Sequence, residues 1–235
     1  VEGKLEGWSQ NRRRIAAGGT PVDPQVRAFV LTDERETPFA IVTNFACHPT
    51  IMGGKNLTLS AEYPGAMART LEAVCPDCQA MFINGACGEL NPNWFHLEHD
   101  SFDSIHRMGG ALAGEVMRAM YTGIQTQKPE ETVILSGSKW NEMLPLWKQP
   151  DLGGAKEILS QQKSLLARAE AGDFPPNAFP FWHSMTVDEN LSVPIAESYV
   201  SWAEKLVSLA EANLLVEAPE AEVQVLRIGQ GGIAS

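Results

Sequence analysis

Two stretches near the N-terminus predict a pair of adjacent strands. Residues 25–32 alternate between apolar and other side chains, which is typical of a half-buried strand. Residues 38–46 are more apolar, which predicts a central strand. The charged residues 33–36 between them suit a hairpin turn. His48-Pro49 ends the second strand, because proline cannot continue a hydrogen-bonded ladder.

The pattern then changes to helical spacing. After a loop over 49–60, the spacing of Met67, Leu71 and Val74 predicts a helix that begins near Glu62, with Ser60 as a cap and with Pro64 in the first turn. Residues 79–84 predict a short buried strand, and 85–92 a tight turn. A second helix is expected over 103–121, and its apolar face consists of Ile105, Met108, Leu112, Val116 and Met120.

The order of strand, glycine-containing loop and helix occurs twice, which indicates an α/β domain with a mixed β-sheet flanked by helices. Residues 1–24 are polar and are expected to be loop. Farther on, the pattern predicts a strand near 131–140, helices near 154–171 and 194–213, and a last strand over 223–229. No linker divides the sequence, so residues 1–235 are predicted to form a single α/β domain.

Composition narrows the classes of function. The 235 residues carry a formal net charge of −11, which disfavours binding of nucleic acid through the overall field. No apolar stretch is long enough to span a bilayer. The four cysteines are too few for a disulfide scaffold in a chain of this length.

Candidate chemistry begins at His48, which follows the predicted central strand in the stretch 44–50. The carboxyl ends of strands in α/β folds form the edge where sites are built, and an imidazole there can bind a metal or act as a base. The alternative is a histidine bonded to a backbone carbonyl, with no role in chemistry.

The turn after residue 84 is the second candidate. Gly85 and Gly88 permit backbone conformations that expose N–H groups to a ligand. Asn84, Glu89 and Asn91 add polar groups at the same sheet edge. The alternative is a tight strand-to-helix turn that needs glycine for steric reasons alone.

Two weaker patterns also contain metal-binding residue types. His99, Asp103 and His106 share one helical face near His96, but solvated side chains in a polar first turn account for them more simply. Cys75-Pro76-Asp77-Cys78 follows a helix, whereas a redox pair normally precedes one, so these cysteines are interpreted as loop residues. The aromatic segment 174–182 is interpreted as packing between two helices.

An ordered set of short motifs resembles the N-terminal domain of neutral/alkaline non-lysosomal ceramidases and their bacterial relatives. The resemblance covers about the first half of the chain. Its motifs are Asn11-Arg12, the two strands, Asn44 to Thr50, Asn56 with Ser60 to Gly65, and Gly85 to Pro92.

The resemblance implies a catalytic zinc in a largely α/β domain, bound in that family by two histidines, a glutamate and a tyrosine. His48 matches one histidine ligand, and Arg12 matches an active-site arginine, whose planar fork suits carboxylates and oxyanions. The motifs that carry the other ligands in that family have no match here. The further zinc ligands are therefore expected outside this chain, which begins at Val1 and is predicted to be the middle of a longer protein.

Ceramidases carry a serine in a turn where this chain has Asn91. Asparagine has no hydroxyl to activate, although a mechanism in which zinc activates water would not need one. The first hypothesis is a zinc-dependent hydrolase of an amide or related acyl bond, acting on a lipid amide or a more polar analogue. In it, His48 holds the metal, Arg12 and Asn91 are catalytic, and Asn84, Gly88 and Glu89 contact substrate. The alternatives are a non-catalytic binding module and a hydrolase whose metal lies on the 96–106 cluster.

Overall fold

The computed structural model describes residues 1–11, 22–53, 56–93, 97–126, 134–144, 150–173, 189–215, 219–229 and 231–234. The chain forms two compact units, Val1–Pro129 and Glu130–Ser235, and each is described by itself. The single domain expected for residues 1–235 stays a prediction. The segment 174–182 lies outside the described residues.

The first unit is built from a four-stranded sheet, a two-stranded sheet and two helices. Its elements are β1 (Glu2–Lys4), β2 (Ser9–Asn11), β3 (Gln25–Thr32), β4 (Pro38–Phe45), α1 (Glu62–Val74), β5 (Gln79–Asn84), β6 (Leu90–Pro92) and α2 (Phe102–Thr126). The strands predicted over 25–32, 38–46 and 79–84 are therefore confirmed, as are both helices. Residues 1–24 are not all loop, because β1 and β2 lie within them.

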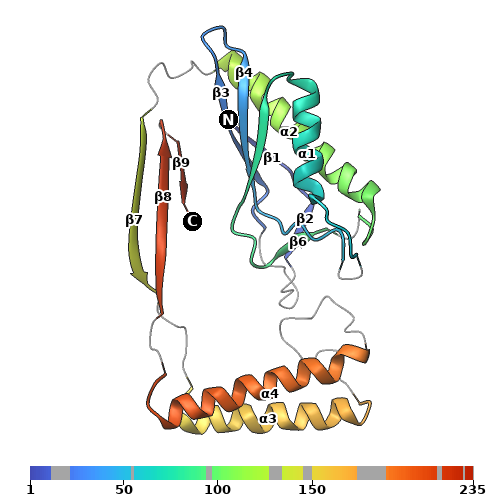
Figure 1. Cartoon of the computed structure of the whole chain (residues 1–235), viewed down its shortest axis with the longest axis vertical. Coiled ribbons are helices and arrows are strands. Elements are labelled where there is room, and N and C mark those ends of the chain that lie inside the picture. The colour runs from blue at the N-terminus through green and yellow to red at the C-terminus, as the bar shows by residue number, and fades with distance from the viewer. Residues whose placement is uncertain are drawn as a thin grey trace. The chain divides into compact units, whose positions relative to one another are not determined.

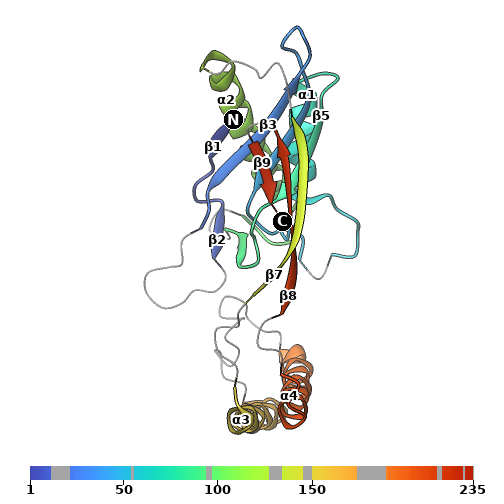
Figure 2. The ribbon, with the colours of Figure 1, turned by 90° about the vertical axis from the view of Figure 1, so that its left-hand side faces the viewer.

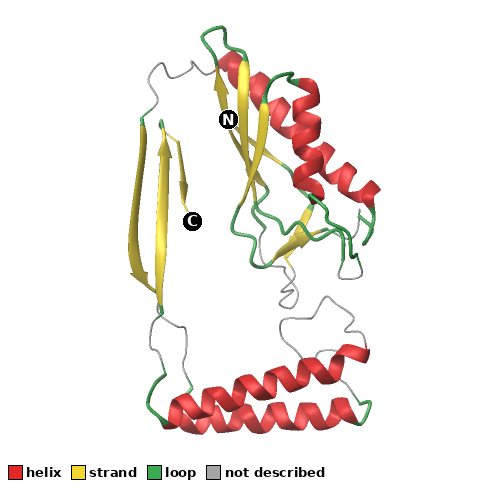
Figure 3. Cartoon of the chain, viewed as in Figure 1, coloured by secondary structure: helices red, strands yellow, loops and turns green. Residues whose placement is uncertain are grey.

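The four-stranded sheet is mixed, with the order β1-β3-β4-β5. β3 and β4 form the predicted antiparallel hairpin, in which the Asp33 carboxylate accepts hydrogen bonds from the backbone of Arg35 and Thr37 at 2.9 and 2.8 Å. β4 and β5 are parallel, because α1 carries the chain back to the start of the sheet between them. The α/β fold with a mixed sheet flanked by helices is therefore confirmed (Figure 3).

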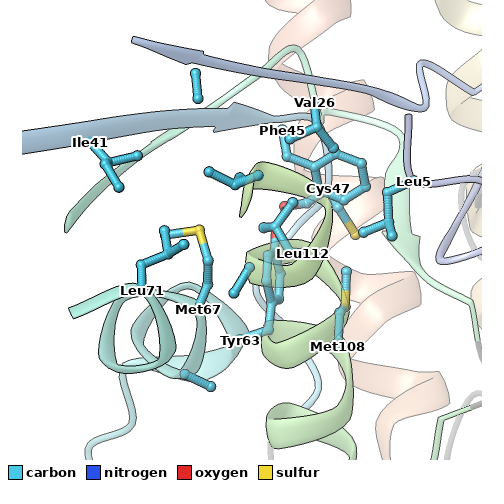
Figure 4. Close-up of a cluster of buried hydrophobic side chains, with 14 of the residues drawn as sticks. Leu5, Val26, Ile41, Phe45, Cys47, Tyr63, Met67, Leu71, Met108 and Leu112 are labelled. Carbon is cyan, nitrogen blue, oxygen red and sulfur yellow. The ribbon is translucent and has the colours of Figure 1, made fainter. Parts of the chain in front are cut away.

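Both helices of this unit lie on the same face of the sheet, and α2 crosses behind α1 (Figure 1). Figure 4 shows the core between the sheet and these helices, where Phe45 and Ile41 from β4 meet Tyr63, Met67 and other apolar side chains from the two helices. All five residues predicted for the apolar face of the second helix are buried: Ile105, Met108, Leu112, Val116 and Met120.

Two details of the predicted core are wrong. Val74 shares the helical spacing of Met67 and Leu71, but it is 48% exposed because α1 ends there and the chain turns away. The strand β5 is not buried as predicted, since no residue of it is fully buried and Met81 is 50% exposed. β5 is the edge strand of the sheet in the first unit, and its residues Ala80 and Phe82 pack against the core.

The second unit contains a three-stranded antiparallel sheet and a helical hairpin. The strands are β7 (Leu135–Met143), β8 (Glu220–Ile228) and β9 (Gly231–Ala234), in sheet order, and β9 is a strand that the sequence pattern did not predict. The helices α3 (Leu152–Glu170) and α4 (Glu189–Glu211) run side by side (Figures 1 and 2). Ion pairs of 3.2 Å join Lys156 to Glu211 and Lys163 to Glu204, which fits an antiparallel pair. No described helix of the chain is long and apolar enough to cross a membrane.

Candidate functional site

The two sequence candidates lie at one edge of the main sheet, where the parallel strands β4 and β5 end together. Phe45 and Asn84, the last residues of the two strands, are paired, and the Gly85 N–H donates to the Phe45 carbonyl at 3.0 Å. A Cβ on Gly85 would lie only 2.9 Å from the Cβ of Ala46 and 3.1 Å from its Cα. Glycine is needed here because the two chain segments leave the sheet in direct contact.

After this contact, the backbone of His48 is hydrogen-bonded to the turn that follows β5. Its N–H donates to the Leu90 carbonyl at 2.9 Å, and the Leu90 N–H donates to the Cys87 carbonyl at 2.8 Å. The Nδ1 atom of His48 and the Sγ atom of Cys87 are 3.4 Å apart. Both side chains are half-buried, so the pair faces partly toward solvent at the sheet edge.

Two buried residues, Cys47 and Tyr63, hold the backbone next to His48 by hydrogen bonds. Cys47 is fully buried, and its thiol donates to the His48 carbonyl at 3.6 Å. The hydroxyl of Tyr63, on α1, donates to the Cys47 carbonyl at 2.6 Å. Burial raises the pKa of the Cys47 thiol and of the Tyr63 hydroxyl well above their usual values, so both stay protonated at neutral pH. These groups hold the backbone in place and carry no charge.

Two carboxylates hold the loop after His48. Glu62 accepts from the Met52 N–H at 2.6 Å, and Asp100 accepts from the Gly53 N–H at 2.7 Å. Both acidic residues have left-handed backbone, with φ of 53° and 54°, which is unfavourable for a side chain with a Cβ. The other Glu62 oxygen, Oε2, is buried and has no hydrogen-bond partner among the described residues. Ser60 was predicted as the cap of α1, but the N-cap is Ala61 and no side chain caps it. Ser60 lies one residue earlier, and its hydroxyl accepts from the Glu62 N–H at 3.0 Å.

The polar residues predicted for the turn lie at the same edge. Asn84 is exposed, and the Oδ1 atom of its side-chain amide accepts from the Cys47 backbone N–H at 3.4 Å. Gly88 is exposed and Glu89 is half-buried. Asn91 is half-buried in the middle of β6, where it pairs with Gln10 of β2.

The structure thus brings together the sequence candidates His48, Asn84, Gly88, Glu89 and Asn91 around one turn. Arg12 lies outside the described residues, which stop at Asn11 before resuming at residue 22. Neither the role of Glu62 as a loop anchor nor the contact of Cys87 with His48 was predicted from the sequence.

The ligand atoms at this edge are of types that bind zinc. An imidazole nitrogen and, once deprotonated, a cysteine sulfur are both good zinc ligands, and here the two atoms are adjacent. The described residues supply too few ligands for a complete zinc site, because no three of their His, Cys, Asp or Glu side chains gather closely enough to hold a metal ion. The 96–106 cluster is no exception within that part of the chain: Asp103 and His106 are exposed, and His96 lies outside it.

The Cys-x-x-Cys segment follows a helix and precedes a strand, as the sequence predicted. The Cys78 N–H donates to the Cys75 carbonyl at 3.1 Å, and neither thiol is in a disulfide. Burial and the neighbouring Cys75 raise the pKa of Cys78. This segment lies at the opposite end of β5 from the turn after Asn84, so it does not belong to the candidate site.

Comparison with solved structures shows where this fold occurs. The crystal structure of neutral ceramidase from Pseudomonas aeruginosa matches 99% of this chain with a TM-score of 0.54 and 16% sequence identity. In fold, the chain is similar to part of a neutral ceramidase. A second structure, a ceramidase complexed with C2, matches 99% of the chain with a TM-score of 0.55 and the same identity. The chain spans 38% and 40% of the lengths of these two proteins. No protein-family model and no curated protein matches the sequence.

Proposed function

We propose that the chain is part of a hydrolase that cleaves an amide or a related acyl bond, with a zinc ion held in part by His48. One observation carries the proposal: His48 is held on the turn after β5, at the carboxyl edge of a parallel strand pair. That edge is where α/β folds place their sites. The similarity in fold to neutral ceramidases supports the same class of chemistry.

Different residues at this edge would bind the metal and the substrate. A zinc ion bound there supplies Lewis-acid polarisation of the scissile carbonyl. Asn84 and Glu89 would hydrogen-bond to substrate, and Gly88 would let the substrate approach the backbone. The Asn91 amide can donate to a substrate carbonyl and accept from its N–H, but it cannot act as a nucleophile. Arg12 would orient a carboxylate or an oxyanion.

The substrate class follows from the same residues. A lipid amide is the first candidate, because the two matching structures are ceramidases. The amide of Asn91 and the carboxylate of Glu89 also suit a polar N-acyl compound, since both offer hydrogen bonds to amide and hydroxyl groups. Ceramide and a short-chain polar N-acyl amide are therefore the two substrates to compare.

The test is metal content together with hydrolysis in the full-length protein. We expect about one zinc per chain by elemental analysis, lost in His48→Ala and retained in His106→Ala, whose exposed side chain on α2 is the matched control. Release of fatty acid from an N-acyl amide should follow the zinc content. The opposite pattern, with zinc lost only in His106→Ala, would move the metal to the 96–106 cluster.

A second function is favoured by two observations. Asn91 stands where ceramidases have a serine, and the described residues supply no group of three zinc ligands. Both fit a binding module that kept the fold without the chemistry. Full-length protein that contains no zinc and hydrolyses no N-acyl amide, but still binds one, would establish this function and exclude the hydrolase.

A further inference from the structure

Cys87 is placed to share a metal ion with His48. Resting on the proposed function, we propose that the zinc centre of this protein includes a thiolate ligand from Cys87. In the related ceramidases the ligands implied by the sequence resemblance are two histidines, a glutamate and a tyrosine. A sulfur ligand would therefore be a feature of this chain's own site.

The spacing of the two donor atoms is the first argument. Zinc binds imidazole nitrogen at about 2.0 Å and thiolate sulfur at about 2.3 Å, so a tetrahedral angle between them separates the two donors by about 3.5 Å. The observed separation of His48 Nδ1 and Cys87 Sγ is 3.4 Å. The spacing of these two donor atoms therefore suits an ion bound by both of them.

The rigidity of the backbone is the second argument. His48 and Cys87 are tied through one residue, because the His48 N–H bonds to the Leu90 carbonyl and the Leu90 N–H bonds to the Cys87 carbonyl. Leu90 itself is only 3% exposed, so this link is anchored in the core. A site whose donors are already held at the required spacing loses little entropy when the metal binds.

The surroundings of the other thiols exclude them from this role. Cys47 is fully buried, and its thiol donates to the His48 carbonyl within the core layer. Cys75 and Cys78 lie beyond the other end of β5. Cys87 alone among the four described cysteines contacts an imidazole. On binding, the Zn–S bond forms, the S–H bond breaks and the proton passes to solvent, with no change of oxidation state.

Cobalt(II) in place of zinc gives a test that does not depend on activity. A Co²⁺ ion bound to a thiolate shows a near-ultraviolet sulfur-to-metal charge-transfer band, which histidine and oxygen ligands do not produce. We expect this band in the full-length protein titrated with Co²⁺, and we expect it to disappear in Cys87→Ser and Cys87→Ala. Cys75→Ser, which removes another half-buried thiol, should keep it.

The affinities provide a second measurement. Loss of a partner in the outer shell of a metal site typically costs about 10–100-fold in affinity, so loss of a ligand should cost at least about 100-fold. We expect a decrease of that size in zinc affinity for both Cys87 variants, with unchanged thermal unfolding of the metal-free protein showing that they still fold.

Three results would overturn the proposal, and they separate it from the proposed function. Co²⁺ binding that needs His48 but shows no thiolate band would leave the His48 site standing and remove Cys87 from it. A tenfold loss of affinity in Cys87→Ala without any band would make Cys87 a residue that positions the imidazole. Absence of Co²⁺ and Zn²⁺ binding in the intact protein would refute both the ligand and the hydrolase.

Discussion

The helices α1 and α2 pack closely at Gly109. A substitution at this position tests that packing. A Cβ at Gly109 would lie 2.5 Å from the Ala66 Cβ, 2.7 Å from the Tyr63 carbonyl oxygen and 2.8 Å from the Met67 nitrogen. Carbon atoms normally approach to about 3.5–4.0 Å, so the contact with the Ala66 Cβ is short by about an ångström. The contacts with the oxygen and the nitrogen are also too short, by a smaller amount. Two of the three atoms belong to the backbone of α1, and the helices must separate to admit the methyl group.

The magnitude follows from two opposing terms. Replacing a glycine inside a helix by alanine stabilises the helix by about 1 kcal/mol. Overpacking a buried contact costs about 1–3 kcal/mol, and more where backbone must move. Gly114 is the matched control, because it lies in the same helix, is exposed and has no atom within 4 Å of an added Cβ. The propensity term is common to both substitutions, so their difference isolates the steric cost, which we expect to be about 2–3 kcal/mol.

The assay compares Gly109→Ala with Gly114→Ala by thermal unfolding and by hydrogen exchange of the α1 and α2 amides. Gly114→Ala should be slightly more stable than the parent, and Gly109→Ala should melt about 5–10 °C below Gly114→Ala. Hydrogen exchange assigns the loss to the first unit, because its helices should lose protection while α3 and α4 keep theirs. Equal stability of the two variants would refute the close packing of α1 on α2.

Three further predictions concern the sheet edge. Gly85→Ala should weaken the proposed zinc binding, because its Cβ would force apart the two segments that leave β4 and β5. Isothermal titration with zinc checks this, and unchanged affinity would contradict it. Glu62→Ala should lower the free energy of unfolding in urea by about 1–3 kcal/mol, since the Met52 N–H loses its acceptor, and Glu62→Gln should lose less because its amide oxygen still accepts. Burial raises the pKa of Tyr63 above its usual value of 10.0, so its contribution to stability is complete below about pH 10 and decreases above it by up to about 1.4 kcal/mol per pH unit. In urea unfolding, Tyr63→Phe should remove this part of the decrease in stability at alkaline pH. It should also lower the free energy of unfolding at neutral pH by about 1 kcal/mol, because the hydrogen bond to the Cys47 carbonyl is lost. An unchanged dependence on pH would show that another group titrates.

Much of the first unit could be predicted from the sequence because its strands and helices have clear periodicity. The alternation predicted for β3 is seen in the burial of its first four residues, and the helical spacing predicted for α2 matches its buried face. The short strands β1 and β2 could not be predicted, since three residues carry no periodic signal and their pairing depends on distant partners. The sequence pattern placed His48 at a sheet edge, and the prediction named no partner for its side chain.

A signal for that partner was nevertheless present. His48 lies three residues after Phe45, and Cys87 lies three residues after Asn84, the residue paired with Phe45. Equal distances from paired strand ends bring residues together when the strands are parallel. The anchoring role of Glu62 had no such signal, because it depends on a left-handed backbone that the sequence pattern does not predict for glutamate.

The in-register ends of β4 and β5 also determine which changes of length the chain can tolerate. Inserting or deleting one residue between Phe45 and His48, or between Asn84 and Cys87, would offset the two donors by a full residue, about 3.3 Å along an extended chain. The pair would then be broken although every side chain was still present. A change of length between Gly53 and Ser60 should leave His48 in place, because the hydrogen bonds of Glu62 and Asp100 hold the chain at Met52 and Gly53. In relatives of this chain, gaps should therefore gather in that loop and be absent from the two three-residue steps.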